Sequence, residues 1–169
     1  MMPQMPKPLL VFDTVSLANF LFADATHVLT LRYTGRSRIT GQVFDELTSG
    51  MRARPKLKII ESLLTKKQFS LVSLTMAENA RYAEILTNLG RGESSCIAVA
   101  ASRGWTMVTD DRAARSRCAE LKIPVTGTIG ILKAACADKQ IVPSEADRIL
   151  HRMVEIGFYS PVRRVSDLL

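Results

Sequence analysis

The chain has 169 residues, of which 47% are hydrophobic and 23% charged, the balance of a globular protein large enough to bury a core. No apolar run reaches the ~18 residues that a membrane-spanning helix needs, so we expect no membrane span. The formal net charge is +7, which favours a polyanionic partner such as nucleic acid, although many soluble proteins are simply basic.

Residues 1–8 contain prolines but no apolar stretch of the kind found in signal peptides, so we expect a cytoplasmic protein. The three cysteines, Cys96, Cys118 and Cys136, lie among small apolar residues, which predicts buried or half-buried reduced thiols rather than disulfides. The only histidines, His27 and His151, are far apart in the sequence and are expected to be structural.

The N-terminal part of the chain alternates apolar runs with helical periodicity. Residues 8–13 predict a buried strand that ends at an acid, and residues 16–22 a helix capped by Ser16. The segment 24–37 fits either an alternating strand or a helix that ends at Gly35. The next predicted elements are a helix capped by Thr40 that stops at Gly50, a helix over 56–64 opened by Pro55, a strand over 68–74, and a helix capped by Thr75 that runs to Leu89.

The second half of the chain is more regular. The predicted elements are a helix over 93–102 closed by Gly104, a strand over 105–109, a helix over 111–121, a strand over 123–127, a helix over 128–139, and a helix to Gly157 opened by a capping box of Ser144 and Asp147. The tail docks through Phe158 and Tyr159, or else frays. Residues 126–130 predict a turn, with Thr126 or Thr128 as helix cap, since they lack the lysine of a phosphate-binding loop.

Short apolar runs that alternate with helices are typical of βαβ units. We therefore predict one α/β domain over residues 1–169, with three α/β/α layers, a mostly parallel sheet, a flexible leader at 1–7 and a tail at 160–169.

Acidic residues stand where this architecture places ligands. In open parallel sheets, ligands bind beyond the carboxyl ends of the strands. Asp13 ends the first predicted strand, and Asp110 and Asp111 end the strand over 105–109, so three acids share one rim if these strands are neighbours. Glu93 is in the first turn of its helix and Glu46 at the margin of a buried face. Each alone could be a helix-terminal or solvated acid, but together they favour a site.

Five segments carry a family resemblance: VFDTVSL, VFDEL, GRGESSCIAVA, VTDDRAAR and IPVTGTIGILKAA, in this order up to about Lys139. The chain resembles the PIN domain nucleases (named for the PilT N-terminus), and its last two segments are similar to a prokaryotic PIN-like branch of the VapC type. Two features depart from the family pattern. Many toxin members have Asp as the third acid, set closer to the "IA" pair, whereas Ser94 follows Glu93 here, and Val15 stands where a small residue is common.

The resemblance implies a metal-dependent endoribonuclease on a five-stranded parallel sheet, with 5′-phosphate and 3′-hydroxyl products and an association with toxin–antitoxin pairs. It implies RNA as substrate, Mg²⁺ or Mn²⁺ as cofactor, and an antitoxin and a second copy of the chain as partners. The implied catalytic and metal-binding acids are Asp13, Glu46, Glu93 and Asp111, with Asp110 as a further or alternative ligand, and Thr14 and Ser16 as supporting hydroxyls.

Electrostatics gives an independent reason for a metal. Four or five crowded carboxylates cannot all ionise without compensation, so some pKa values must rise, and a hard divalent cation relieves this repulsion. The family pattern of Thr, any residue, Asp selects Asp111 rather than Asp110, and side-chain alternation after Thr109 should let only one of them face Asp13. Phosphate contacts are expected from Arg112, Arg115 and Arg117, unless these form a solvated basic face.

Two other classes of protein fit parts of the pattern. A PIN-like module with little catalytic power could hold RNA or a partner protein on its basic surface. A receiver-like signalling domain also uses acids at strand ends, but Asp13 has no acidic neighbour and no lysine follows the strand over 123–127, so this class is disfavoured.

Overall fold

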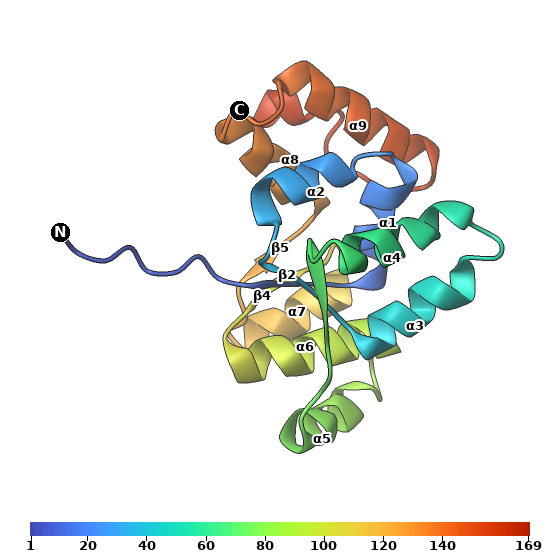
Figure 1. Cartoon of the computed structure of the whole chain (residues 1–169), viewed down its shortest axis with the longest axis vertical. Helices are drawn as coiled ribbons and strands as arrows, with labels where there is room; N and C mark the ends of the chain where they lie inside the picture. Colours follow the sequence, from blue (N-terminus) through green and yellow to red (C-terminus); the bar gives the residue numbers. More distant parts are fainter.

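The computed structural model describes residues 1–169 and shows an all-parallel sheet covered by helices (Figure 1). The sheet has five strands in the order β3-β2-β1-β4-β5, which confirms the predicted α/β fold. The strands are β1 (Leu10–Phe12), β2 (Ser37–Thr40), β3 (Phe69–Val72), β4 (Thr106–Val108) and β5 (Val125–Thr126). Val11, Phe12 and Val108 are fully buried, as expected for central strands covered on both faces.

The helices form a layer on each side of the sheet. They are α1 (Thr14–Phe22), α2 (Thr26–Tyr33), α3 (Gly41–Gly50), α4 (Ile59–Thr65), α5 (Met76–Ile85), α6 (Arg91–Arg103), α7 (Arg112–Glu120), α8 (Thr128–Ala137) and α9 (Pro143–Glu155). On one side α6 packs against β1, β2 and β4, with α3, α5 and α7 beside it, and on the other side α2 contacts α8, which α9 covers (Figure 1). Helix α1 contacts both α3 and α9 and so joins the two layers.

The segment 24–37, for which the sequence allowed either a strand or a helix, contains the helix α2. The helix ends shortly before Gly35, which has a φ of +79°. The strand that follows, β2, was not predicted, because its four residues include the half-buried Arg38 and show no clear apolar run. Pro55 opens a short 3-10 turn (Pro55–Lys58) that leads into α4. Helix α5 ends at Ile85, four residues before the predicted Leu89.

Thr40 caps α3 as predicted, since its hydroxyl accepts the N–H of Val43 at 3.2 Å. The predicted cap of α1 is wrong. Asp13 rather than Ser16 is the N-cap, and its Oδ1 accepts the N–H of Ser16 at 2.8 Å. A carboxylate at this position satisfies a free helix N–H as well as a serine would, so Asp13 has a structural role besides any chemical one.

The predicted caps of α8 and α9 are also wrong. Gly127 is the N-cap of α8, and the N–H of Thr128, in the first turn, donates to the carboxylate of Asp110. Helix α9 starts with Pro143 after Val142 and has no capping box. Asp147 instead accepts the N–H and the hydroxyl of Ser166, at 3.0 and 2.6 Å.

The C-terminal tail docks, as predicted for Phe158, which packs against the core, but not for Tyr159. Its fully buried residue is Val165, in a 3-10 turn (Val165–Leu168) that packs against α8 and α9. Phe158 is half-buried, and Tyr159 is 92% exposed. At the other end of the chain, residues 1–7 are exposed and without regular structure, and they extend away from the sheet (Figure 1).

The thiols and histidines fit the sequence expectations. Cys96 and Cys118 are buried, Cys136 is half-buried, and all three are free. His27 Nε2 lies 2.9 Å from Glu145 Oε1, which joins α2 to α9. None of the helices has both the length and the apolar composition required to cross a membrane.

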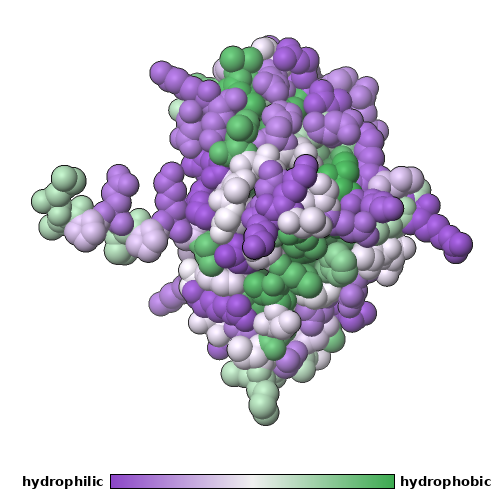
Figure 2. Space-filling view, viewed as in Figure 1, coloured by the Kyte–Doolittle hydropathy of each residue, from purple (hydrophilic) through white to green (hydrophobic).

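Figure 2 shows that the face seen in Figure 1 is hydrophilic over most of its area, with an apolar patch across the middle of the molecule. In this view the sheet edge β3 and the helix α4 lie there (Figure 1). Leu71 on β3 is 50% exposed, and Ile59 and Leu64 of α4 are half-buried. The sheet therefore keeps some apolar surface at this edge.

Candidate active site

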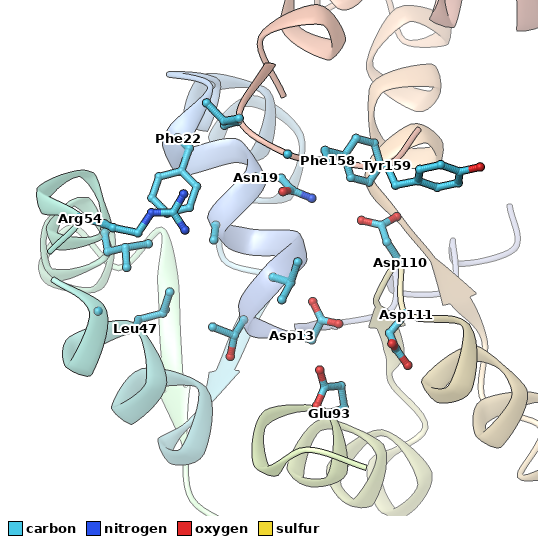
Figure 3. A pocket seen from close by; sticks show the side chains of 17 residues that line it. Asp13, Asn19, Phe22, Leu47, Arg54, Glu93, Asp110, Asp111, Phe158 and Tyr159 are labelled. Carbon is cyan, nitrogen blue, oxygen red and sulfur yellow. The ribbon is translucent and has the colours of Figure 1, made fainter. Parts of the chain in front are cut away.

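A cleft of about 560 Å³ opens at the carboxyl ends of β1 and β4. These strands are neighbours in parallel register, with Phe12 opposite Val108. This is the arrangement expected if Asp13, Asp110 and Asp111 are to share one rim of the sheet. Strand β2 pairs with one edge of β1 and β4 with the other, so the strand order reverses between β1 and β4. Ligands bind open α/β sheets at such a switch point. The acids that line the cleft are Asp13, Glu93, Asp110 and Asp111 (Figure 3).

Asp13 is the most buried of these acids, with 1% of its surface exposed. Its main-chain N–H donates to Val108 O at 3.1 Å, which fixes it against the end of β4. Burial raises the pKa of Asp13 to about 6, against hydrogen bonds from Thr109 and Ser16, and the charge of Glu93 adds to the rise. Asp13 is thus a carboxyl whose ionised form is poorly solvated, and a nearby cation would stabilise that form.

Glu93 lies in the first turn of α6 and is half-buried. Its pKa is raised mainly by burial, and then by the charges of Glu46 and Asp111. The expectation that crowding raises some of the carboxyl pKa values is confirmed for Asp13 and Glu93, but burial is the larger cause for both.

Glu46 lies beside the cleft rather than in its lining. Its Oε2 accepts a short hydrogen bond from the Thr14 hydroxyl, and its Oε1 accepts the N–H of Gly92 at 2.8 Å. A Cβ at Gly92 would lie 2.9 Å from both Glu46 Oε2 and Thr14 Oγ1. Gly92 therefore lets α1, α3 and α6 meet at this carboxylate.

Asp110 and Asp111 both line the cleft, but their carboxylates point in opposite directions, that of Asp110 toward Phe158 and Tyr159 and that of Asp111 toward the side of Glu93 (Figure 3). Strand β4 ends at Val108, and Asp111 is the N-cap of α7. Asp111 uses Oδ1 to accept the N–H of Ala114 at 2.7 Å, while Oδ2 makes no hydrogen bond within the protein.

Both oxygens of Asp110 are engaged by the protein. Oδ1 accepts the N–H of Thr128 at 2.9 Å, and Oδ2 accepts the hydroxyls of Thr128 and, at 3.2 Å, Ser16. The Ser16 hydroxyl thus bonds to Asp110, which ties the end of β4 to α1 and α8. Asp111 is the more available of the two acids.

The three arginines of α7 do not form one patch. Arg115 turns toward Asp110, and its Nε donates to Thr109 O at 2.9 Å. Arg117 points toward the α5–α6 connection and pairs with Glu120 at 2.8 Å. Arg112 is exposed at the start of the helix. Only Arg115 therefore lies in a hollow that contains one of the acids.

The remaining lining of the cleft was not predicted from the sequence. It includes Asn19, Phe22, Arg54, Phe158 and Tyr159 (Figure 3). The guanidinium carbon of Arg54 lies 3.8 Å from the centroid of the Phe22 ring. Helical spacing from Val15, which also lines the cleft, could have indicated Asn19 and Phe22, but no sequence pattern places the chain beyond α9 next to the first strand.

The acids of the cleft provide oxygen donors for a divalent cation. No three acidic side chains converge closely enough in this conformation to hold a metal ion together. Mg²⁺ requires fewer protein ligands, because one or two carboxylates with waters and substrate phosphates commonly complete its coordination. Asp13, with Glu93 and Asp111 in the same cleft, offers the hard oxygen donors that Mg²⁺ and Mn²⁺ prefer, so the residues present fit such an ion.

Comparison with known proteins identifies the family. A search of curated proteins gives no match. A crystal structure of VapBC2 from Rickettsia felis bound to a DNA fragment from their promoter is similar over 70% of this chain and 98% of that chain, with 14% sequence identity and a TM-score of 0.49. The family model described as DUF3368, a PIN domain, matches residues 9–169. Because this match covers nearly the whole chain, the protein belongs to the PIN domain family DUF3368.

Proposed function

We propose that this protein is a metal-dependent endoribonuclease that cleaves RNA phosphodiesters at the acidic cleft. The observation that carries the proposal is the buried carboxyl of Asp13, with its pKa raised to about 6, beside Glu93 and Asp111 at the switch point of the sheet. Carboxyls with raised pKa values in a cleft mark candidate functional sites. Membership of the PIN domain family supports a nuclease in particular.

In this proposal one or two of Asp13, Glu93 and Asp111 would hold Mg²⁺ or Mn²⁺ directly, and waters and substrate phosphate would complete the coordination. Asp13 and Asp111 each keep one oxygen on a helix N–H, which fixes their orientation, and Asp111 leaves its second oxygen for the ion. A bound ion would lower the pKa of a water and polarise the phosphodiester. Asp110 positions α1 and α8 around the site through its bonds to Ser16 and Thr128.

Glu46 remains a candidate fourth acid of the set. To reach an ion it would have to release the Thr14 hydroxyl or the Gly92 N–H, which it binds in this conformation. While those bonds hold, Glu46 acts through its charge on Glu93 and through the position that it gives to α6.

The alternative function is a PIN-like module that binds RNA or a partner protein but cleaves little. The absence of a ready three-acid metal site in this conformation favours it. The two functions predict different results when purified protein is incubated with mixed single-stranded RNAs in Mn²⁺ and in EDTA. The nuclease cuts only with the metal and leaves 5′-phosphate and 3′-hydroxyl ends. RNA that is bound yet intact at every metal concentration would support the binding module.

We also propose the partners that the PIN resemblance implies, an antitoxin protein and a second copy of this chain. The apolar residues Met76 and Leu86, at the two ends of α5, are 91% and 37% exposed and offer surface for self-association. Light scattering at micromolar concentration should then give about twice the mass of one chain, 18.7 kDa. A mass of 18.7 kDa would count against the dimer.

A further inference from the structure

The acidic cleft continues past its acids into a second hollow. That hollow has a volume of about 240 Å³, includes Arg115 and Ile129, and shares Asp110, Phe158 and Tyr159 with the first. The chain just beyond α9 therefore lies along both hollows, above Asp110 (Figure 3). Together the two hollows form a groove that leads from Asp13, past the aromatic pair Phe158 and Tyr159, to Arg115.

The aromatic pair is placed by a glycine turn at the end of α9. The N–H of Phe158 donates to Met153 O at 2.9 Å and that of Gly157 to Val154 O at 3.1 Å, with Gly157 at φ +110°. This is a Schellman arrangement, which reverses the chain after a helix and favours glycine. Phe158 is left half-buried against the core, and Tyr159 is 92% exposed at the edge of the groove.

Two arginines flank the acids of the groove at positions that suit the phosphates of a single nucleic-acid strand. Arg115 lies at one end and Arg54, stacked on Phe22, borders the cleft on its far side. Guanidinium groups recognise phosphates, whereas exposed aromatic rings stack on bases. Proteins that bind single strands combine these two features, a basic track for the backbone and aromatic side chains for the bases.

We infer that Tyr159, supported by Phe158, is a stacking platform for one base of a single-stranded RNA, next to the acids, and that Arg115 contacts a neighbouring phosphate. The inference rests on the proposed function for the identity of the strand, but binding can be measured without cleavage. A duplex does not fit, because its paired bases are stacked on one another and cannot offer a free face. Tyr159 thus acts as a substrate-positioning residue.

The test is equilibrium binding of a fluorescent, unstructured RNA of about 12 nucleotides in EDTA, measured by anisotropy. Tyr159→Ala should weaken binding about tenfold, within the range expected for one lost base stack, and Tyr159→Phe should restore it. The control is Leu31→Ala, which removes an exposed apolar side chain from α2, away from the groove, and should leave the affinity unchanged. A duplex of the same sequence should bind more weakly than the single strand.

An abasic strand of the same length separates stacking from a general structural effect. Wild-type protein and Tyr159→Ala should bind it with equal affinity, because no base remains to stack. Equal affinities of the two proteins for the normal strand, an equal loss on both strands, or no binding by the wild type would each overturn the inference.

Cleavage in Mn²⁺ distinguishes this inference from the proposed function. Tyr159-dependent binding without cleavage would refute the nuclease and retain the stacking platform. Cleavage by wild-type protein with no contribution from Tyr159 to binding would refute the platform and retain the nuclease.

Discussion

The carboxylate of Glu46 accepts the main-chain N–H of Gly92 at 2.8 Å, and this single bond joins α3 to the first turn of α6. Glu93, the residue after Gly92, lines the acidic cleft. The position of one proposed acid is therefore set by another acid, and the contact depends on the absence of a side chain at residue 92.

Gly92→Ala should disturb the cleft, although alanine is normally the better helix former. The added Cβ would lie 2.9 Å from Glu46 Oε2 and Thr14 Oγ1, so that the Glu46 carboxylate has to move. We expect the cleavage rate to fall roughly 10- to 100-fold, because small displacements of catalytic groups can slow a reaction by this much. The control is Gly41→Ala in α3, where a Cβ meets nothing within 4 Å. Equal cleavage rates for the two variants would contradict this role of Gly92.

The raised pKa of Asp13 should make stability depend on pH. Its pKa is about 6 in the folded protein, against an ordinary value of 3.8, so the folded state holds the proton more tightly. Without metal, the free energy of unfolding should therefore be highest below pH 3.8 as far as this group is concerned, and should fall as the pH rises through 6, by on the order of 3 kcal/mol.

Asp13→Asn should remove this dependence while keeping an oxygen for the N–H of Ser16. Measured by urea unfolding in EDTA, the variant should be more stable than wild type above pH 6, and this advantage should vanish toward pH 4. Asp13→Ala is the control, since it also loses the helix cap, at a cost of about 1 kcal/mol. An advantage of Asp13→Asn that does not change with pH would show that the Asp13 carboxyl is not responsible.

Replacement of Asp110 and replacement of Asp111 should change different properties of the protein. Asp110→Asn keeps one oxygen for the N–H of Thr128 but loses the oxygen that accepts the hydroxyls of Thr128 and Ser16, and we expect it to lower the free energy of unfolding by about 1–3 kcal/mol. Asp111→Asn keeps an acceptor for the N–H of Ala114 and should leave stability nearly unchanged, but it should weaken Mn²⁺ binding more than Asp110→Asn does. A Mn²⁺ titration of both variants, with urea unfolding in parallel, measures the two effects. The reverse order in metal affinity would make Asp110 the ligand.

The arginines of α7 should contribute unequally to nucleic-acid binding. Arg115 lies in the groove, whereas Arg117 is paired with Glu120 on another side of the helix. Arg115→Gln should reduce the slope of log affinity against log salt by about 0.7 for one lost phosphate contact on a single strand. Arg117→Gln should not change the slope. If neither variant changes it, the basic residues of α7 form a solvated face.

The sequence was sufficient for the elements that have strong local signals. The hydroxyl of Thr40 before an apolar helical face predicts the start of α3, and the apolar runs before Asp13 and Asp110 predict two central strands. Because parallel strands place their carboxyl ends at one edge, the meeting of Asp13 with Asp110 and Asp111 could be predicted as well.

What the sequence could not predict depends on contacts between distant residues. Both Asp110 and Thr128 looked suited to capping, and only the packing of α8 beside β4 gives the N–H of Thr128 to Asp110. Arg115 and Arg117 are two residues apart and so point to nearly opposite sides of α7, which the sequence could predict. Which of them faces the groove depends on how α7 packs against α6. Tyr159 is far from Asp13 in the chain and enters the cleft only through the turn at Gly157.

The measurement that tests the central claim most directly is the rate of RNA cleavage by wild-type protein and by Asp13→Asn, each in Mn²⁺ and in EDTA. Asp45→Asn is the matched control, since Asp45 is an exposed acid adjacent to Glu46 that is not part of the cleft lining. We predict that wild type and Asp45→Asn cleave in Mn²⁺ but not in EDTA, and that Asp13→Asn, although folded, cleaves in neither. Cleavage by Asp13→Asn at the wild-type rate would contradict the assignment of the active site to this cleft.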